Sequence, residues 1–348
     1  MKEEPTSSEI SIKGAGRRIV RNLLSLLRAL LYLLGIVWAT GAVYYDAPLP
    51  NEGDWGRSLL AIGYALVMLL TMVALGSGWR RFLGWTISMG IVAIPWSLKA
   101  PSSRTDWKPG GARLPSAHVE GTSVTFHNFR HFQYDPKGKT NERWESRTVD
   151  LSKLKGLDFV HHELPNSPLA HPLLSFDFGE DGHIAFSVEI RYREGQAFSP
   201  LRGLYKQYDL IYLAGDERDF FQERALVRSE PVRLYRLIYP LERIREIFHE
   251  TIAAMNALRS KPRFYNSLTA NCTTSYLRQA PDGKRPNFDY RIILNGFMES
   301  LLYERGVIAT DGLSLEKLVQ RASINDAAEK AREDPAFSRR IREGRPGF

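Results

Sequence analysis

The chain has 348 residues, a formal net charge of +8 and one cysteine, so it is long enough for two domains of ordinary size. A single cysteine excludes an intrachain disulfide framework and any metal site built from several cysteines. The basic residues form no run interleaved with aromatic side chains, which argues against a nucleic-acid partner.

Three apolar stretches lie within the first hundred residues: Leu23 to Tyr45, Ser58 to Leu75 and Phe82 to Leu98. Each approaches the length of about 20 residues that a helix needs to cross a bilayer core. Buried core helices of a soluble protein are the alternative, but aromatic residues lie where the membrane interfaces should be. We predict a three-helix transmembrane anchor over residues 23–98. The interiors of the stretches contain no Asp, Glu, Lys or His, which argues against a transport path.

The basic residues that flank these stretches predict their orientation. They stand before or early in the first stretch and again between the second and third: Lys13, Arg17, Arg18, Arg21, Arg28, Arg80 and Arg81. The first connecting loop is acidic instead. The positive-inside rule therefore places residues 1–22 in the cytoplasm. Three crossings deliver the remaining chain to the far side of the membrane, which for the inner membrane of a bacterium is the periplasm.

Residues 99–118 are rich in Pro, Gly and Ser and predict a linker, which leaves residues 119–348 as the exterior domain. Strand patterns cover 118–120, 123–129, 144–149 and 157–163. The last of these ends in His161, His162 and Glu163, which are metal-ligand types. Adjacent strand residues point to opposite faces, so both histidines cannot bind one ion without distortion. We expect one structural and one surface histidine.

A β-hairpin follows, with arms over 171–178 and 184–191 joined by Gly179-Glu180-Asp181-Gly182. His171 opens the first arm. Glu189 falls on the polar face of the second arm together with Ser187, where a carboxylate could orient the imidazole. An ion pair with Arg191 or Arg193 is the alternative role for Glu189.

The remaining chain alternates between strand and helix patterns. Strands are predicted at 209–214 and 232–239, and a helix with apolar residues at helical spacing begins at Pro240. The charged run 216–219 predicts a solvated or salt-bridged surface turn. The tail has a helical pattern at 325–331 and an Arg-rich end, which we interpret as a packing helix and a charged surface.

The only cysteine lies in a polar segment that precedes a helical pattern. Asn271 is a candidate N-cap, which places the Cys272 sulfur among the unpaired N–H groups of the first turn. The positive end of a helix favours the thiolate, so the pKa of the thiol is expected to fall. An ordinary buried position is the alternative, because free Cys is among the most buried residue types. With His171 as base, the two residues predict a nucleophile–base pair.

Nine segments together resemble one family, the N-terminal periplasmic domain of Lnb, a bacterial lipoprotein-acylating protein. They are Arg104–Trp107, Val124–Arg130, Ala170–His171, Leu174–Gly179, Ser187–Arg191, Tyr208–Tyr212, Asp216–Arg218, Tyr265–Asn266 and Asn271–Thr274. The order of His before Cys is also similar to that of circularly permuted papain-like folds, among them LRAT-type acyltransferases and NlpC/P60 relatives. The chain differs from Lnb in having its membrane helices before the domain.

The resemblance implies an α+β domain with an antiparallel sheet. It implies Cys272 as nucleophile, His171 as base and Glu189 as the orienting residue, with Asn271, Thr273 and Tyr265 shaping the oxyanion or substrate site. The function it implies is a thiol acyltransferase or lipid hydrolase that acts on phospholipid or lipoprotein acyl groups, without metal or cofactor. Two alternatives remain open: a cell-wall peptidase or amidase of the NlpC/P60 type, and a non-catalytic envelope-assembly module.

Overall fold

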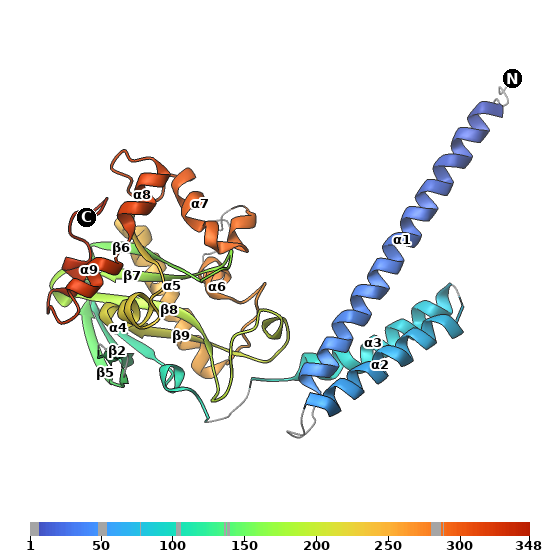
Figure 1. Ribbon diagram of the computed structural model, residues 1–348, viewed down its shortest axis with the longest axis horizontal. Coiled ribbons are helices and arrows are strands. Elements are labelled where there is room, and N and C mark those ends of the chain that lie inside the picture. The colour runs from blue at the N-terminus through green and yellow to red at the C-terminus, as the bar shows by residue number, and fades with distance from the viewer. Residues whose placement is uncertain are drawn as a thin grey trace. The chain divides into compact units, whose positions relative to one another are not determined.

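The computed structural model describes residues 7–47, 54–76, 78–101, 106–135, 137, 140–279, 287 and 289–348. The chain divides into two compact units (Figure 1). The helical unit comprises Met1–Lys99 and Tyr205–Gln207, and the sheet unit comprises Ala100–Leu204 and Tyr208–Phe348. The predicted segment Arg104–Trp107 lies partly outside the described residues.

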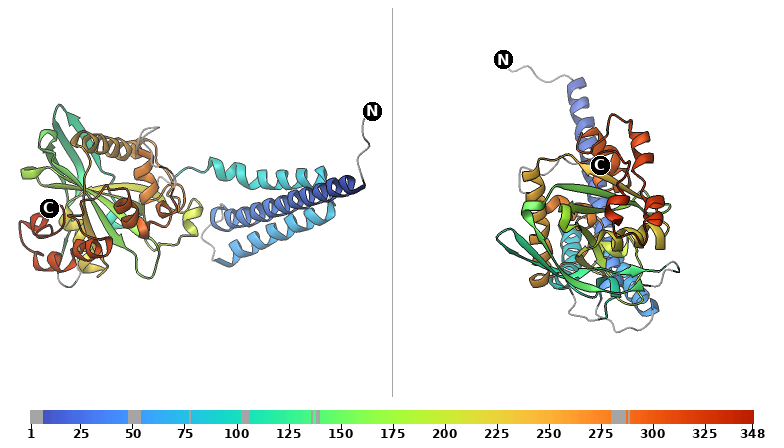
Figure 2. Two further views of the ribbon diagram at one scale, coloured as in Figure 1. Left: turned by 90° about the horizontal axis from the view of Figure 1, so that it is seen from above. Right: turned by 90° about the vertical axis from the view of Figure 1, so that its left-hand side faces the viewer.

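The helical unit contains three helices among its described residues: α1 (Ser7–Asp46), α2 (Asp54–Ala74) and α3 (Trp79–Leu98). They lie side by side (Figure 2). A small core formed by Ile36, Met68 and Met72 joins α1 to α2, and Trp85 of α3 packs against it. Most of the remaining large apolar side chains of these helices are exposed, which suits helices that face lipid.

The predicted three-span anchor is confirmed only in part. By length and composition, two described segments could cross a membrane, Gly16–Asp46 and Trp55–Ala74. The third predicted span forms a helix, α3, but does not meet the same criteria. Arg80 and Arg81 occupy its first turn, and the apolar stretch that follows is shorter than the ~20 residues that a bilayer core requires.

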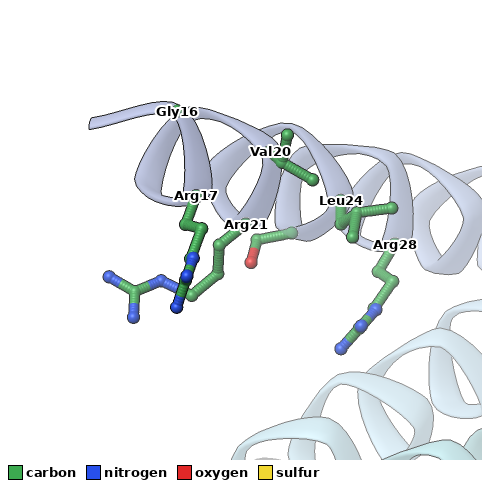
Figure 3. Close-up of a pocket in the computed structure, with 7 residues that line it drawn as sticks. Gly16, Arg17, Val20, Arg21, Leu24 and Arg28 are labelled. Atoms are coloured by element: carbon green, nitrogen blue, oxygen red, sulfur yellow. The ribbon is translucent and has the colours of Figure 1, made fainter. Parts of the chain in front are cut away.

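Three of the basic residues that flank the first span lie on one face of α1. Arg17, Arg21 and Arg28 project from the helix on the same side (Figure 3). Residues four and then seven positions apart share one face of an α-helix, which explains the alignment. All three side chains are exposed, and such long basic side chains can extend from an apolar helix toward lipid headgroups.

A mixed sheet of eight strands forms the centre of the sheet unit. Its strand order is β1-β2-β9-β8-β7-β6-β10, and β5 pairs with β2. The strands are β1 (Ser116–Glu120), β2 (Ser123–Arg130), β5 (Trp144–Asp150), β6 (Gly156–Glu163), β7 (Ala170–Asp177), β8 (His183–Arg191), β9 (Asp209–Gly215) and β10 (Val232–Leu237). A separate ribbon pairs β3 (Gln133–Tyr134) with β4 (Thr140–Asn141).

The α+β class is confirmed, but the expectation of an antiparallel sheet is wrong at one join. β2 and β9 pair in parallel at Arg130 and Gly215, whereas the other neighbouring strands of the main sheet are antiparallel. These two strands are distant in the chain, so no hairpin turn forces their directions to be opposite. The local sequence pattern therefore could not reveal the parallel pairing.

The predicted hairpin over residues 171–191 is confirmed as β7 and β8, with Leu174 opposite Phe186. Gly179 and Gly182 in its turn have φ of 61° and 87°, a conformation that favours glycine. The helix predicted after Pro240 is α5 (Leu241–Ser260), which has Pro240 at its N-cap. The tail pattern at 325–331 is α9 (Asn325–Lys330).

Helices cover both faces of the sheet. On one face Phe248 of α5 meets the rings of Phe126, Phe176 and Phe186 with centroids 5.0–6.3 Å apart. The other face packs against α4, α9 and α10. Because strand side chains alternate, β9 contributes Tyr212 to the first core and its neighbours to the second. The shorter helices are α4 (Glu217–Gln222), α6 (Cys272–Gln279), α7 (Met298–Glu304), α8 (Leu315–Ala322) and α10 (Phe337–Arg340).

The charged run 216–219 is not the predicted surface turn. Asp216 caps α4 by accepting a hydrogen bond from the backbone N–H of Arg218 (2.9 Å), whereas Glu217 and Asp219 are each 1% exposed. Asp219 accepts two hydrogen bonds from Arg130, at 2.7 and 2.9 Å. The partner of each buried carboxylate lies far away in the sequence, so a local charge pattern could not distinguish burial from exposure.

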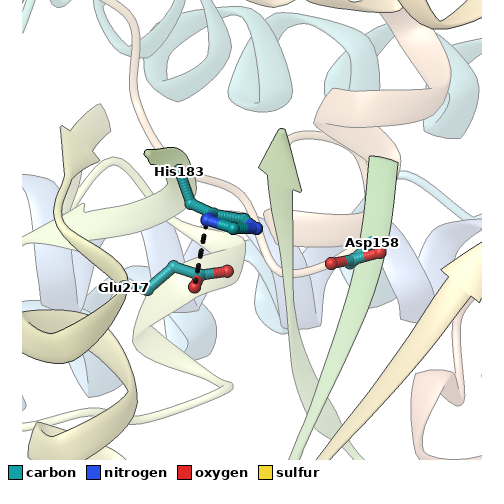
Figure 4. Close-up of side chains that lie close together, drawn as sticks. All are labelled: Asp158, His183 and Glu217. Atoms are coloured by element: carbon teal, nitrogen blue, oxygen red, sulfur yellow. Dashed lines mark ion pairs between the residues drawn. The ribbon is translucent and has the colours of Figure 1, made fainter. Parts of the chain in front are cut away.

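The Arg-rich tail is also partly buried, contrary to the expected charged surface. Arg342 is 7% exposed and donates hydrogen bonds to Asp158 (2.7 Å) and Glu217 (2.9 Å). His183 lies 3.9 Å from Glu217 (Figure 4). Asp158, His183 and Glu217 are metal-ligand types, but Arg342 and Arg236 already neutralise the two carboxylates. We interpret this cluster as an ion network that fixes the tail to the sheet.

Candidate active site

The predicted start of the helix at the cysteine is confirmed. α6 begins at Cys272, and the Asn271 side chain accepts a hydrogen bond from the backbone N–H of Thr274 (2.8 Å). The Thr274 hydroxyl accepts a bond from the Asn271 N–H in return (3.0 Å). Asn271 therefore acts as the N-cap, and Cys272 occupies the first helical position, where backbone N–H groups lack intrahelical partners.

The Cys272 thiol is free and 8% exposed, and it lines a cavity of about 230 Å³. His171, Glu189, Asn271 and Tyr265 line the same cavity. Five of the six predicted site residues thus meet in one place, although they come from segments about a hundred positions apart. The sixth, Thr273, is buried but is not among the lining residues.

His171 lies on β7, and its Nε2 is directed toward β8. It is 2.7 Å from the hydroxyl of Ser187 and 3.1 Å from Glu189 Oε1. The pairing of β7 with β8 ends at Leu173 and Ser187, and its register extended by two residues brings His171 opposite Glu189. Glu189 therefore lies where a carboxylate could orient the imidazole, and the alternative ion pair with Arg191 or Arg193 is absent from the ion pairs of the described residues.

His171 and Glu189 each stabilise the charged form of the other. Burial alone would lower the pKa of His171, but the Glu189 carboxylate and the nearby Cys272 sulfur raise it to about 9. Burial would raise the pKa of Glu189, yet the His171 charge holds it well below its usual value. The geometry thus favours a protonated imidazole between a carboxylate and a sulfur at neutral pH.

Two further residues support Glu189. Ser187 donates a hydrogen bond to Glu189 Oε1 (2.6 Å), and Arg224 donates to the same oxygen (2.5 Å). Both are buried. The alternation of side chains along β8 places Ser187 on the same face as Glu189, so the sequence could indicate that Ser187 belongs to the site. No sequence pattern indicates Arg224, because it lies in an irregular helical turn (Glu223–Val227).

Asn295, like Arg224, is a site residue that no sequence pattern indicates. Its amide nitrogen lies 3.8 Å from the Cys272 sulfur and donates to the carbonyl of Ala170 and the hydroxyl of Thr273, both at 2.7 Å. Its amide oxygen accepts a bond from the N–H of Ala170 (2.8 Å). Asn295 therefore ties the residue before His171 to the residue after Cys272.

The other predicted site residues are Tyr265, Thr273 and Asn271. Burial, followed by the charge of Cys272, raises the pKa of Tyr265, so its phenol stays protonated. Thr273 contributes its hydroxyl to the Asn295 contact. Asn271 also donates its side-chain N–H to the carbonyl of Ser267 (2.8 Å), which holds the loop before α6.

The prediction of one surface histidine in the pair at 161–162 is wrong, because both rings are buried. His162 lines the cavity and its Nε2 lies 2.5 Å from Glu230. His161 faces the other way, near Glu163 and Glu299, which could complete a set of metal-ligand atoms. Arg233 already pairs with both of these carboxylates, at 2.6 and 3.3 Å, and so takes the place of a cation.

Comparison with known proteins gives one match. Residues 140–296 match the family model of the Lnb N-terminal periplasmic domain. Neither the curated proteins nor the solved structures gave a match. The matched segment contains Cys272, His171, Glu189 and Asn295, and the two candidate spans precede it. The protein is therefore a membrane-anchored bacterial protein, and residues 140–296 of the chain belong to the family of Lnb N-terminal periplasmic domains.

Proposed function

We propose that this protein is a Cys-dependent acyltransferase or lipid hydrolase that acts on phospholipid or lipoprotein acyl groups at the outer face of the bacterial inner membrane. One observation supports the proposal above the others. The Cys272 sulfur and the His171–Glu189 pair line one cavity, and the sulfur is among the groups that raise the pKa of His171. Nucleophile, base and orienting carboxylate are the three parts of such a site.

In the first half-reaction the Cys272 thiolate attacks the carbonyl carbon of an acyl ester, and a C–S bond forms. The resulting oxyanion is stabilised by the backbone N–H groups at the start of α6. When the intermediate collapses, the C–O ester bond breaks and His171 gives its proton to the departing alkoxide. In the second half-reaction, an amine, a hydroxyl or water loses a proton to His171 and attacks the thioester, which restores the thiolate.

The permuted papain-like arrangement is part of the same proposal. It is supported by a nucleophilic cysteine at the start of α6 and a histidine on a neighbouring strand, β7. We also propose the partner: membrane lipid as acyl donor, with a lipoprotein as a candidate acceptor. An anchored domain suits an acyl donor that does not diffuse through water.

The test is the release of lysophospholipid by the full-length protein in nanodiscs that contain phospholipid. Wild type is expected to release it, whereas Cys272→Ala and His171→Gln are expected to lose most of the activity, by about 10²-fold or more for the histidine. Cleavage of purified muropeptides without any lysophospholipid would instead identify a peptidase or amidase. A Cys272→Ala variant that complements a deletion strain as well as wild type would identify a non-catalytic module.

We propose the predicted orientation as well, with residues 1–22 in the cytoplasm and the sheet unit in the periplasm. Arg17, Arg18 and Arg21 before the first span and Arg80 and Arg81 after the second support it. Residues 1–22 and the sheet unit lie on opposite sides of the membrane only if the chain crosses it an odd number of times. In this proposal α3 therefore forms the third crossing. Alkaline phosphatase fused after Phe348 should then be active, and inactivity there combined with fluorescence of a cytoplasmic reporter would refute the orientation.

A further inference from the structure

The exposed apolar side chains of the sheet unit gather around the cavity that holds Cys272. Twelve large apolar side chains are exposed among the described residues of this unit, and seven of them belong to three short segments near the cavity. These seven, which we call the apolar rim, are Phe198, Leu201, Leu268, Tyr290, Ile293, Leu294 and Phe297. Phe198 and Ile293 line the cavity, and each of the others lies within three residues of a lining residue.

The segments that carry the apolar rim are held by hydrogen bonds. Ser267 donates its hydroxyl to the carbonyl of Pro200 (2.8 Å) and its N–H to that of Gly203 (2.9 Å). The N–H of Gly296 donates to the carbonyl of Pro168 (3.0 Å). A surface that keeps apolar side chains exposed on anchored loops is typical of a place where something apolar binds.

We propose that the apolar rim docks the sheet unit onto the phospholipid bilayer that anchors the same chain. The inference rests on the proposed function, because it identifies the route by which an acyl chain reaches the Cys272 sulfur. A lipid can enter this cavity without crossing water only if the entrance of the cavity touches the bilayer. The apolar rim around the cavity provides such a contact.

Two observations favour the bilayer over a soluble partner protein. Residues 99–115 are the only chain between α3 and β1, and even fully extended they reach at most about 60 Å, so the sheet unit stays near the membrane. The rim segments 198–203 and 266–271 contain an exposed arginine, Arg202, and no acidic residue. A basic side chain beside apolar ones suits an anionic lipid surface.

Fluorescence quenching by lipid tests the docking directly. The full-length protein, in a Cys272→Ala background, receives a single cysteine at Leu268 or at Phe297 and is labelled with bimane. It is then placed in nanodiscs of phosphatidylethanolamine and phosphatidylglycerol that contain spin-labelled lipid. The matched control is Ile238→Cys, because Ile238 is 56% exposed and lies outside the apolar rim.

The expected result is strong quenching at residues 268 and 297 and little at residue 238. Equal quenching at all three positions would overturn the proposal, and so would an absence of quenching, which would leave the apolar rim as a surface for a partner protein. The measurement does not depend on catalysis. Quenching in these variants, together with no lysophospholipid release by the wild-type protein in the same nanodiscs, would therefore reject the proposed function while retaining the docking.

A second measurement links docking to turnover. Leu201→Glu combined with Leu268→Glu is expected to lower the release of lysophospholipid from nanodiscs by about tenfold or more, because charged side chains oppose insertion. Val119→Glu is the control, since Val119 is exposed on β1 outside the apolar rim and its variant should match wild type. Equal activity of the double variant and the control would reject the docking and leave the proposed function intact.

Discussion

The proton on His171 is the residue-scale feature on which the proposed chemistry depends. In an unfolded chain the pKa of a histidine is about 6.5, whereas in the folded protein Glu189 and Cys272 raise the pKa of His171 to about 9. The folded state therefore binds this proton more tightly than the unfolded state. The corresponding contribution to stability is complete below pH ~6.5 and is lost as the pH rises toward about 9.

The same shift predicts the pH dependence of activity. The rate should fall as the pH rises through about 9, because His171 then loses the proton that stabilises the thiolate and that the leaving group needs. Glu189→Gln removes the carboxylate that raises this pKa, so the alkaline limb of the kcat/KM profile should move to lower pH. The test is to measure the initial rates of wild type and Glu189→Gln across the pH range and to compare the alkaline limbs. An unchanged alkaline limb in Glu189→Gln would show that Glu189 does not act through His171.

Asn295 is expected to act as a positioning residue, because it connects the strand of His171 to the helix of Cys272. Asn295→Ala leaves the buried N–H of Ala170 without a partner and its C=O with only the long contact to the Cys272 thiol (3.9 Å), which costs about 1–3 kcal/mol of stability. It should also lower kcat with little change in KM, since the sulfur and the imidazole lose their fixed separation.

A matched control for Asn295 exists elsewhere in the fold. Asn256 on α5 makes the same pair of hydrogen bonds to the backbone of Ala117, at 2.8 and 2.9 Å. Asn256→Ala should lose comparable stability in thermal unfolding but keep the wild-type kcat. If both variants lose kcat equally, the role of Asn295 is structural only.

How much of the site the sequence can reveal depends on how close together in the chain the interacting residues are. Helix capping is local, so Asn271 and Cys272 were predictable, and alternation along β8 placed Glu189 and Ser187 on one face. Arg224 and Asn295 act through contacts with residues more than 20 positions away, from segments without a regular pattern. No local rule connects them to the cavity, so only the folded chain reveals them.

At the scale of elements, α6 presents the nucleophile only if its first turn is capped. Asn271→Ala removes the acceptor for the Thr274 N–H and should cost about 1 kcal/mol of stability. It should also slow alkylation of Cys272 by iodoacetamide, because the sulfur loses the ordered helix start. Asp216→Ala, which removes the N-cap of α4 outside the cavity, is the control and should leave the alkylation rate unchanged. Equal alkylation rates in all three proteins would contradict this role of the cap.

The sheet shows where local patterns are sufficient and where they fail. The strands at 123–130 and 156–163 and the hairpin over 170–191 were predictable because each contains β-branched and aromatic residues and each is bounded by turn residues. The parallel join of β2 to β9 and the burial of Glu217 and Asp219 were not. Both depend on pairing between distant segments, and an Arg partner that neutralises a buried carboxylate leaves no trace in the neighbouring sequence.

At the scale of the molecule, Arg342 connects the end of the chain to the centre of the sheet. Arg342→Met leaves the buried carboxylates of Asp158 and Glu217 without their main partner, which should cost about 3–5 kcal/mol. Arg339→Met is the control, because that side chain is 68% exposed and its ion pair with Glu343 contributes about 0–1 kcal/mol. Thermal unfolding in detergent compares the two, and an equal change would mean that the Arg342 network does not stabilise the fold.

The central claim is that the Cys272 sulfur carries an acyl group during turnover. Intact-mass spectrometry of the full-length protein, quenched in acid after brief incubation with phospholipid, tests this directly. The account predicts one added fatty-acyl mass that peptide mapping places on Cys272, that hydroxylamine removes and that Cys272→Ala lacks. Lysophospholipid release without any such adduct, or an adduct on another residue, would contradict it.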